Sequence, residues 1–353
     1  MGPLCNGDLD RPIKWEIFDC DSGGKNESMG FVQNSVRQFI SNPGKPFDVI
    51  EPDKKAKDKK YVNSGTLSVL PTCYIEHNPT FAEFIQGGCE LSMIVAIDYT
   101  ASNGDPMMPS SLHYCDPAGI NVNQYQLAIR SVGGIIDNYD TDKKYPVYGF
   151  GARVNGTIQH CFSVSDEATG VAGIEEAYMQ SVKNPNIALS GKIIISIYFT
   201  DQIFIIELIF IILNLGPTLL APLLGKVRGR LEANPISQTN QKYHLLLVIC
   251  DGSINDMEPT ISEINQLSAL PISIVIVGVG DADFTDMHQL DGDKNKLGGA
   301  GSRDIVQFVS YRELASQTHL DLAKEVLAEI PDQFLEFMKR KNITPNPPSY
   351  TEK

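Results

Sequence analysis

The stretch Glu90–Ser102, ELSMIVAIDYTAS, decides the fold, because an apolar run ends there in one acid and two hydroxyl side chains. A run that does not alternate with polar residues predicts a strand buried on both faces. Similar runs follow in YHLLLVICDG (243–252) and PISIVIVGVG (271–280). Helical patterns separate these runs, so the sequence predicts an α/β fold with a doubly wound, mostly parallel sheet covered on both faces.

The remaining elements follow from periodicity. Shorter strands are predicted in YPVYGFGARV (145–154), HCFSV (160–164) and IVQFVSY (305–311). Helices are predicted over 123–139, 171–182, 217–233, 258–270 and 321–341, the last with Pro331 as a kink or a break.

The N-terminal part has a different pattern of apolar and polar residues. PIKWEIFDCD (12–21) and MGFVQNSV (29–36) alternate, and GTLSVLPTCYIE (65–76) follows a lysine-rich loop, DKKAKDKK (53–60). Alternation of this kind predicts strands with one exposed face. We therefore expect a β segment over 1–76, a connector over 77–89, an α/β domain over 90–343 and a flexible tail over 344–353.

Composition excludes several classes of function. The net charge of -14 argues against a nucleic-acid-binding protein, which normally presents a basic face. The seven cysteines are scattered and form no CxxC pair, which indicates reduced thiols and a cytosolic rather than secreted protein. No secretory signal opens the chain. Neither HExxH nor GxSxG is present, and no histidine has the spacing of a catalytic pair, so we expect no enzyme.

Acids and hydroxyls collect where the apolar strands end. Asp98, Thr100 and Ser102 form D-x-T-x-S after the first strand, and Asp251 ends another. Ligand sites of open α/β sheets lie beyond the carboxyl ends of the strands. Hard oxygen ligands at this spacing suit Mg²⁺ or Mn²⁺, with Asp251 joining through a water. The alternative is purely structural: Asp98 caps the next turn, and the two hydroxyls satisfy backbone groups.

A second acidic loop lies between the first two predicted strands. FDCDSGGKNESMG places Asp19, Asp21 and Glu27 in the pattern D-x-D-x5-E. Carboxylates on alternate residues of a loop can bind Ca²⁺. A solvated turn is the alternative on sequence alone.

Several motifs resemble one known family. AIDYTASNGDP, YPVYGFGAR, CDGSINDM and VGVGDADFTDM resemble, in this order, the von Willebrand factor A domain of copines. The resemblance implies a metal-ion-dependent adhesion site with Asp98, Thr100 and Ser102 in its first loop, Thr218 of GPT as its middle threonine and Asp251 as its later aspartate. It also implies recruitment of protein partners through an acidic residue that completes the coordination of Mg²⁺ or Mn²⁺.

The N-terminal strands resemble the last strands of a C2 domain, and Asp19, Asp21 and Glu27 its third calcium loop. Because the earlier strands are missing, Ca²⁺ and anionic phospholipids would be bound weakly. The resemblance implies a calcium-dependent, phospholipid-binding regulatory protein in the cytosol and, peripherally, on the cytoplasmic face of the plasma membrane. GGCELSMIVAID resembles plant copines of the BONZAI type, which implies restraint of defence and cell-death responses.

Two alternatives to this function remain. Some plant ubiquitin ligases carry a related A domain with a RING finger, but this chain has no cysteine after Cys250 to build one. The chain could also be a non-functional product of an aberrant transcript.

The run Lys192–Gly216, KIIISIYFTDQIFIIELIFIILNLG, bears on that last alternative, since it contains ten isoleucines. A membrane span is disfavoured, because the central acids Asp201 and Glu207 each cost roughly 2.5–3.5 kcal/mol. A span would also place Asp98 and Asp251 on opposite sides of a membrane. Removing the run restores NIALSGPTLLAP, which resembles copines, so we interpret the run as an apolar insertion encoded by a retained, in-frame intron.

Overall fold

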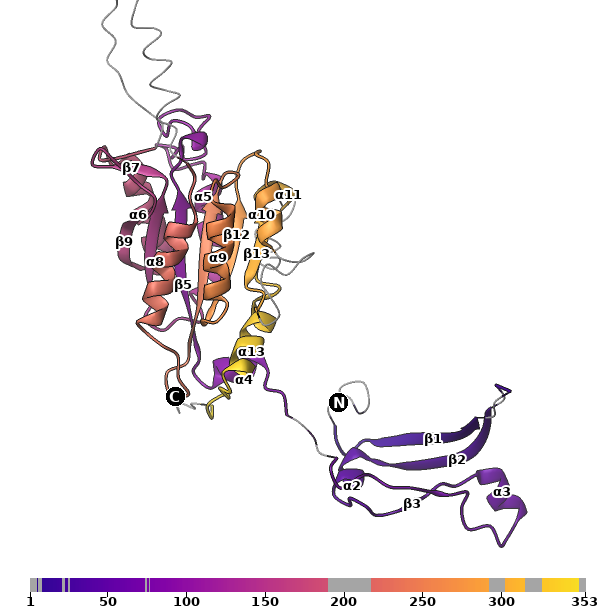
Figure 1. Cartoon of the computed structure of the whole chain (residues 1–353). Helices are drawn as coiled ribbons and strands as arrows, with labels where there is room; N and C mark the ends of the chain where they lie inside the picture. The colour runs from indigo at the N-terminus through magenta and orange to yellow at the C-terminus, as the bar shows by residue number, and fades with distance from the viewer. Residues whose placement is uncertain are drawn as a thin grey trace, which may run out of the picture. The chain divides into compact units, whose positions relative to one another are not determined.

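A computed structural model describes residues 5, 8–20, 23–24, 26–73, 75, 77–189, 217–291, 302–314 and 326–348. The chain divides into two compact units, Met1–Asn78 and Pro79–Lys353 (Figure 1). The run Lys192–Gly216 lies outside the described residues, as do residues 349–353. Within the described part of the chain, no helix has the length and hydrophobicity that crossing a bilayer requires.

The first unit is built on an antiparallel hairpin. Strand β1 (Pro12–Cys20) pairs with β2 (Asn26–Ser35), and the register shifts between Ile17 and Phe18. Its small core consists of Val32, Phe39 and Val49. This unit is less regular than the sequence predicts. The remaining elements are short: α2 (Val36–Ile40), β3 (Phe47–Asp48), α3 (Pro52–Lys57) and β4 (Thr66–Leu67).

Two sequence predictions for this unit are wrong. Among the described residues of the predicted strand 65–76, only those of β4 form a strand, which pairs with β3. The lysine-rich stretch predicted as a loop contains helix α3 instead. The Glu51 side chain accepts a hydrogen bond from the N–H of Asp53, and Pro52 occupies the first turn, two features that favour a helix start.

The second unit is built on a six-stranded sheet, which confirms the predicted α/β fold (Figure 1). The strand order is β13-β12-β11-β5-β6-β9, and only β9 runs antiparallel to its neighbour. The strands are β5 (Glu90–Asp98), β6 (Lys144–Phe150), β9 (Phe162–Thr169), β11 (Lys242–Cys250), β12 (Ile272–Gly278) and β13 (Val306–Ser310). In β5, every residue after Glu90 is buried, as the unbroken apolar run predicts.

Helices cover both faces of this sheet. The helices on one face are α5 (Gln124–Ile136) and α6 (Gly170–Lys183); those on the other are α8 (Ala221–Glu232), α9 (Met257–Leu267) and α10 (Thr285–Leu290). Each face has its own apolar core, and the alternate side chains of the central strands supply both cores. The arrangement leaves the carboxyl ends of β5, β11 and β12 at a common edge.

The stretch 145–154, predicted as one strand, is two. Gly151 has φ +73° and separates β6 from β7 (Ala152–Val154). Strand β7 then turns through Asn155 and Gly156 into β8 (Thr157–Gln159) and also pairs with β10 (Ile187–Leu189). A left-handed glycine within an apolar run is a signal for such a break.

The ends of the α/β unit pack together. Helix α4 (Phe81–Gln86) lies within the stretch 77–89 that the sequence indicates as a connector, and Phe84 contacts Phe334 of α13 (Ile330–Arg340). Pro331 occupies the first turn of α13, and residues 327–329 before it are not helical, so the helical pattern is broken there rather than kinked. Thr344, in the predicted tail, accepts hydrogen bonds from the side chains of Gln238 and Gln241 through its carbonyl oxygen.

His244 on β11 makes the stability of the unit dependent on pH. Its Nδ1 has no hydrogen-bond partner among the described residues, and burial lowers the pKa of the ring from 6.5 to about 4. The unfolded chain therefore takes up a proton at a pH where the folded chain does not. Stability from this group is complete above pH 6.5 and is lost as the pH falls towards 4.

We expect acid to destabilise the unaltered chain more than His244→Leu, by at most about 3.5 kcal/mol, since the pKa of His244 falls from 6.5 to about 4 and each pKa unit is worth about 1.4 kcal/mol. Urea unfolding at a series of pH values measures the difference. Parallel pH profiles of the two proteins would contradict the prediction.

Candidate metal centre

Asp98 is the last residue of β5, and its side chain is completely buried. One carboxylate oxygen, Oδ1, accepts hydrogen bonds from the N–H of Thr100 at 2.8 Å and from its hydroxyl at 2.7 Å. The other, Oδ2, has no hydrogen-bond partner among the described residues. A buried carboxylate oxygen without a hydrogen-bond partner is costly, so Oδ2 is an atom that favours binding a proton or a cation.

A chain of hydroxyls joins Asp98 to the neighbouring strand. The Thr100 hydroxyl lies 2.9 Å from that of Ser102, which donates to Oδ1 of Asp251 at 3.0 Å. Asp251 follows β11, which pairs with β5 in parallel up to Ile249 and Ile97. The sheet therefore brings together four of the side chains that the sequence singles out.

The backbone of Thr218 is held by the loop that follows Asp251. Its N–H donates to Oδ1 of Asn255, and its carbonyl accepts from the Asn255 N–H, both at 2.8 Å. Asn255 belongs to the loop that begins with Asp251. The carboxylate of Asp256 then accepts from the N–H groups of Leu220 and Ala221 and so fixes the start of α8. Among the described contacts, none joins the Thr218 hydroxyl to Asp98, Ser102 or Asp251.

The calcium loop predicted in the first unit is described only in part. Asp19 and Glu27 are exposed and face each other as register partners across β1 and β2. Asp21 lies outside the described residues. In the described ranges, no group of three or more His, Cys, Asp or Glu side chains is gathered for a metal. The cluster at Asp98 is of another kind, since it combines two carboxylates with two hydroxyls.

The electrostatics of the Asp98 cluster suit a divalent cation. Burial, with the nearby charge of Asp251, raises the pKa of Asp98 to about 8, and burial also raises the pKa of Asp251. Without a cation, the two carboxyl groups favour keeping a proton between them. The groups available are oxygens only, the ligands that Mg²⁺ and Mn²⁺ prefer, so the residues fit a small hard cation.

A buried histidine, His113, contacts the backbone at the end of β5. His113 Nε2 lies 2.8 Å from the carbonyl oxygen of Asp98, and its Nδ1 lies 2.9 Å from the Tyr178 hydroxyl. The ring stacks on Tyr125, with centroids 4.3 Å apart. Burial lowers the pKa of His113 to about 4, so the ring is neutral near pH 7. Nε2 therefore donates to the Asp98 carbonyl, and Nδ1 accepts from Tyr178.

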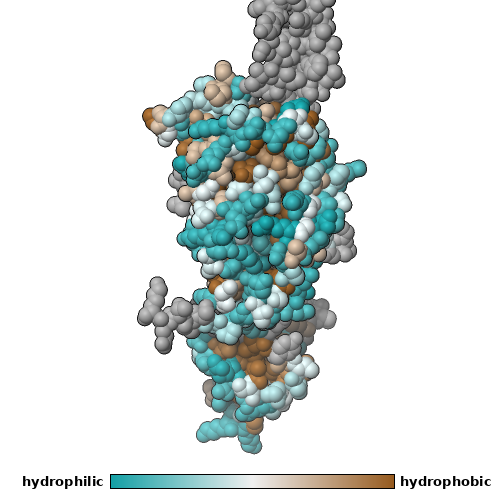
Figure 2. All heavy atoms as spheres, turned by 90° about the vertical axis from the view of Figure 1, so that its left-hand side faces the viewer, coloured by the Kyte–Doolittle hydropathy of each residue, from teal (hydrophilic) through white to brown (hydrophobic). Residues whose placement is uncertain are grey.

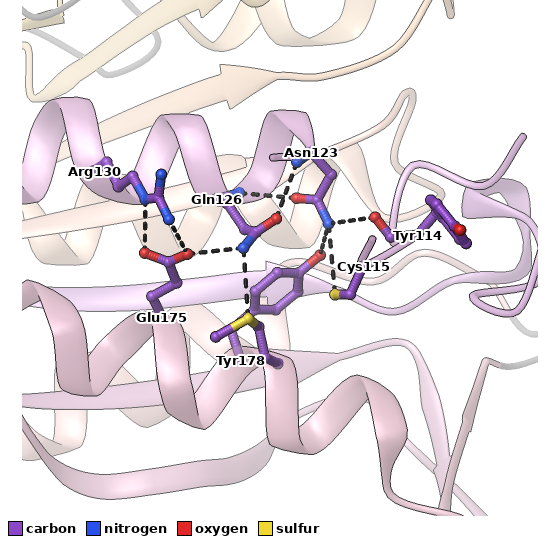
Figure 3. Close-up of polar contacts among 8 residues, drawn as sticks. Tyr114, Cys115, Asn123, Gln126, Arg130, Glu175 and Tyr178 are labelled. Atoms are coloured by element: carbon purple, nitrogen blue, oxygen red, sulfur yellow. Dashed lines mark hydrogen bonds and ion pairs between the residues drawn. The ribbon is translucent and has the colours of Figure 1, made fainter. Parts of the chain in front are cut away.

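Polar side chains around Tyr178, whose hydroxyl also contacts His113, connect α5 to α6 (Figure 3). Asn123 donates to the Tyr178 hydroxyl at 3.1 Å and forms a capping box with Gln126. Gln126 in turn donates to Glu175, which also accepts two hydrogen bonds from Arg130. Sequence reasoning missed this support; the available signals were the capping spacing of Asn123 and Gln126 and the isolated His113 after the metal-type loop.

Gly151 offers a test of how closely Thr100 is held. A Cβ atom on Gly151 would lie 2.4 Å from Cγ2 of Thr100, and the φ of Gly151 is +73°. We expect Gly151→Ala to displace Thr100 and to weaken Mn²⁺ binding by at least about tenfold, the scale found for groups that orient metal ligands. Isothermal calorimetry measures the affinity.

Gly156→Ala is the matched control, because Gly156 has φ +82° but a Cβ there would meet nothing within 4 Å. It therefore adds backbone strain without pushing on the site. Equal losses of affinity in the two variants would show that Thr100 packing is not the cause.

Comparisons with known proteins bear on the whole chain. A family model described as Copine matches residues 111–197 and 206–346, and the interruption lies inside the isoleucine-rich run. Over 354 aligned residues the chain is 42% identical to Copine-A of Dictyostelium discoideum, covering 98% of this chain and 54% of that protein. The chain thus spans about half the length of this curated relative.

Among solved structures, the chain is similar to manganese-loaded Plasmodium vivax TRAP protein, with a TM-score of 0.37 and 9% identity over 66% of this chain and 74% of that one. It is also similar to proximal thread matrix protein 1 of the mussel byssus, with a TM-score of 0.34 and 16% identity over 67% and 48%. The family match and the identity to Copine-A are far more extensive in sequence. On these two findings, the chain belongs to the copine family.

Proposed function

We propose that the second unit acts as a metal-dependent adhesion domain that binds Mg²⁺ or Mn²⁺. The observation that carries this proposal is the buried, unpartnered Oδ2 of Asp98 beside the hydroxyls of Thr100 and Ser102. Asp98, Thr100 and Ser102 would hold the cation, with Asp251 attached through Ser102 and Thr218 supplied by the neighbouring loop. A bound cation supplies positive charge at this edge of the sheet.

The function of this charge is recognition rather than catalysis. With Asp98 as the directly coordinating carboxylate and Asp251 attached only through Ser102, a divalent cation would keep part of its charge and accept an acidic side chain from another protein as a ligand. The described residues would orient the cation, and the burial of Asp98 would limit the access of water. Calorimetry with Mg²⁺ or Mn²⁺ tests the proposal, and its decisive variant is treated in the Discussion.

For the first unit we propose weak, calcium-dependent binding to anionic phospholipids through Asp19, Asp21 and Glu27. The support is the register pairing of Asp19 with Glu27 at the end of the β1–β2 hairpin, together with membership of the family. Calcium would bridge these carboxylates to lipid phosphates and so overcome the repulsion expected of a chain with net charge -14. Such binding would bring the protein from the cytosol to the cytoplasmic face of the plasma membrane.

Sedimentation with phosphatidylserine vesicles tests this activity. We expect a fraction of the chain to pellet with Ca²⁺ and to be released by a chelator, and Asp19→Asn to remove the calcium-dependent fraction. Asp48→Asn, an exposed acid on β3, is the control. Pelleting that does not respond to calcium would refute the proposal for this unit.

The broader role we propose is regulatory: recruitment of acidic protein partners to a membrane. The plant-like motif before Asp98 leads us to propose restraint of defence and cell-death responses as its setting. Loss of the gene would then raise cell death in unchallenged tissue, and a version carrying Ser102→Ala would fail to restore the normal state.

A further inference from the structure

A groove of about 650 Å³ lies between helix α8 and the start of the edge strand β9. One wall is a single face of α8, formed by Pro222, Gly225, Lys226, Gly229 and Arg230. The other wall is formed by Cys161, Phe162, Ser163 and Asp166, with Tyr148. Figure 2 views the side of the molecule that carries β9 and α8; hydrophilic residues predominate there, and hydrophobic residues are visible in recesses between them.

The two glycines of α8 leave this groove open. A glycine inside a helix costs roughly 0.5–1 kcal/mol relative to alanine, so its presence calls for a reason. No packing in the described chain supplies one. A Cβ on Gly229 would meet nothing within 4 Å, and one on Gly225 would meet only the carboxyl group of Glu263, at 3.7 Å. Their absent side chains allow a second backbone to approach the helix.

Lys226 and Arg230, the two cations on this face of α8, differ from the neighbouring Arg228 in their ion pairing. Arg228, which lies outside the groove, pairs with Glu232 and Glu263. Lys226 and Arg230 have no ion pair among the described residues, although the chain has a net charge of -14. The one acid of the groove, Asp166, already accepts a hydrogen bond from Ser163 at 2.7 Å. The lining therefore has an excess positive charge in an otherwise acidic protein.

The spacing of the two cations defines the kind of ligand. Residues four apart on a helix have Cβ atoms about 5–6 Å apart. Alternate residues of an extended strand point the same way and lie about 6–7 Å apart. We propose that the groove binds an extended segment of a partner protein with acidic residues at alternate positions, whose backbone passes over Gly225 and Gly229 and whose carboxylates pair with Lys226 and Arg230.

The test uses two short capped peptides of identical composition. In one, glutamates alternate with alanines; in the other, the glutamates are consecutive. Binding to the full chain is measured by fluorescence anisotropy in a chelator, so that the proposed metal site cannot contribute. We expect the alternating peptide to bind more tightly, and Lys226→Gln or Arg230→Gln each to weaken it by up to about fivefold, the scale of an exposed ion pair.

Two further variants separate binding from folding. Gly229→Ala should raise the melting temperature, because alanine favours the helix, and yet weaken the alternating peptide. Lys339→Gln, which removes an exposed charge on α13, should leave the affinity for the alternating peptide unchanged. Equal affinity for the two peptides, or the same loss in Lys339→Gln as in Lys226→Gln, would overturn the proposal, as would the absence of binding.

Discussion

Mn²⁺ titrated into the unaltered chain is expected to give a saturable binding heat, and Asp98→Ala is expected to weaken this binding by about 100-fold or more. Substitution of groups that only orient metal ligands already costs about 10–100-fold in affinity. Asp98 would be a direct ligand, and its buried Oδ2 is the atom best placed to be one. The variant also removes the acceptor that holds the N–H and the hydroxyl of Thr100.

Two further variants make this result interpretable. Ser102→Ala keeps the Asp98 carboxylate and removes only the hydroxyl that reaches Asp251, so a loss of binding in it cannot arise from disruption of β5. Asp281→Ala removes an exposed acid that follows β12 at the same edge of the sheet. We expect binding to be lost in the first and kept in the second. Heats that are equal in Asp98→Ala and the unaltered chain would remove the metal centre.

Arg303→Met is expected to lower the free energy of unfolding of the second unit by about 3–5 kcal/mol, the scale for breaking a buried network of charge-assisted hydrogen bonds. Arg303 is 3% exposed. Its guanidinium donates to the carbonyls of Ser268, Leu270, Ile272 and Gln333 and to the hydroxyl of Tyr243. It also lies over the Phe337 ring, with its central carbon 5.2 Å from the centroid.

The loss of stability comes from the buried carbonyl groups that no longer have a donor in Arg303→Met. Methionine has a similar length but no donor, so several buried carbonyls lose their partner while the volume stays filled. Arg312→Met, at an exposed position on α11 (Tyr311–Leu314), should change stability by less than about 0.5 kcal/mol. Helical circular dichroism in urea follows the unfolding of the second unit. Tryptophan fluorescence would not, because the single tryptophan, Trp15, belongs to the first unit. Equal midpoints for the two variants would contradict the assignment.

The sequence predicts the sheet well, because buried strands require unbroken apolar runs. Glu90–Asp98 and Lys242–Cys250 have such runs, and the oxygens that follow them necessarily meet at one edge. The predicted metal loop, Asp98 to Ser102, depends only on this rule and on local spacing. Its partner Asp251 follows from the parallel pairing of β11 with β5.

The parts that sequence reasoning missed depend on contacts between distant residues. Arg303 is an ordinary charged residue in the sequence, and its role appears only where the ends of several strands and α13 meet. His113 shows no pattern with Asp98 or Tyr178, since folding brings it to both. In the first unit, the described residues of the strand predicted over 65–76 pair in a ladder only at Thr66 and Leu67, because extended pairing needs a neighbouring strand of matching length.

The anchoring of α8 has a consequence for chain length. Thr218 pairs in both directions with Asn255, and Asp256 binds the N–H groups of Leu220 and Ala221. These described contacts register the helix on the loop after β11. The entropy of closing a loop grows slowly with its length, by about 0.6 kcal/mol for each doubling. Evolution, or an engineer inserting a reporter, can thus lengthen or shorten the chain just ahead of Pro217 while the domain keeps its architecture.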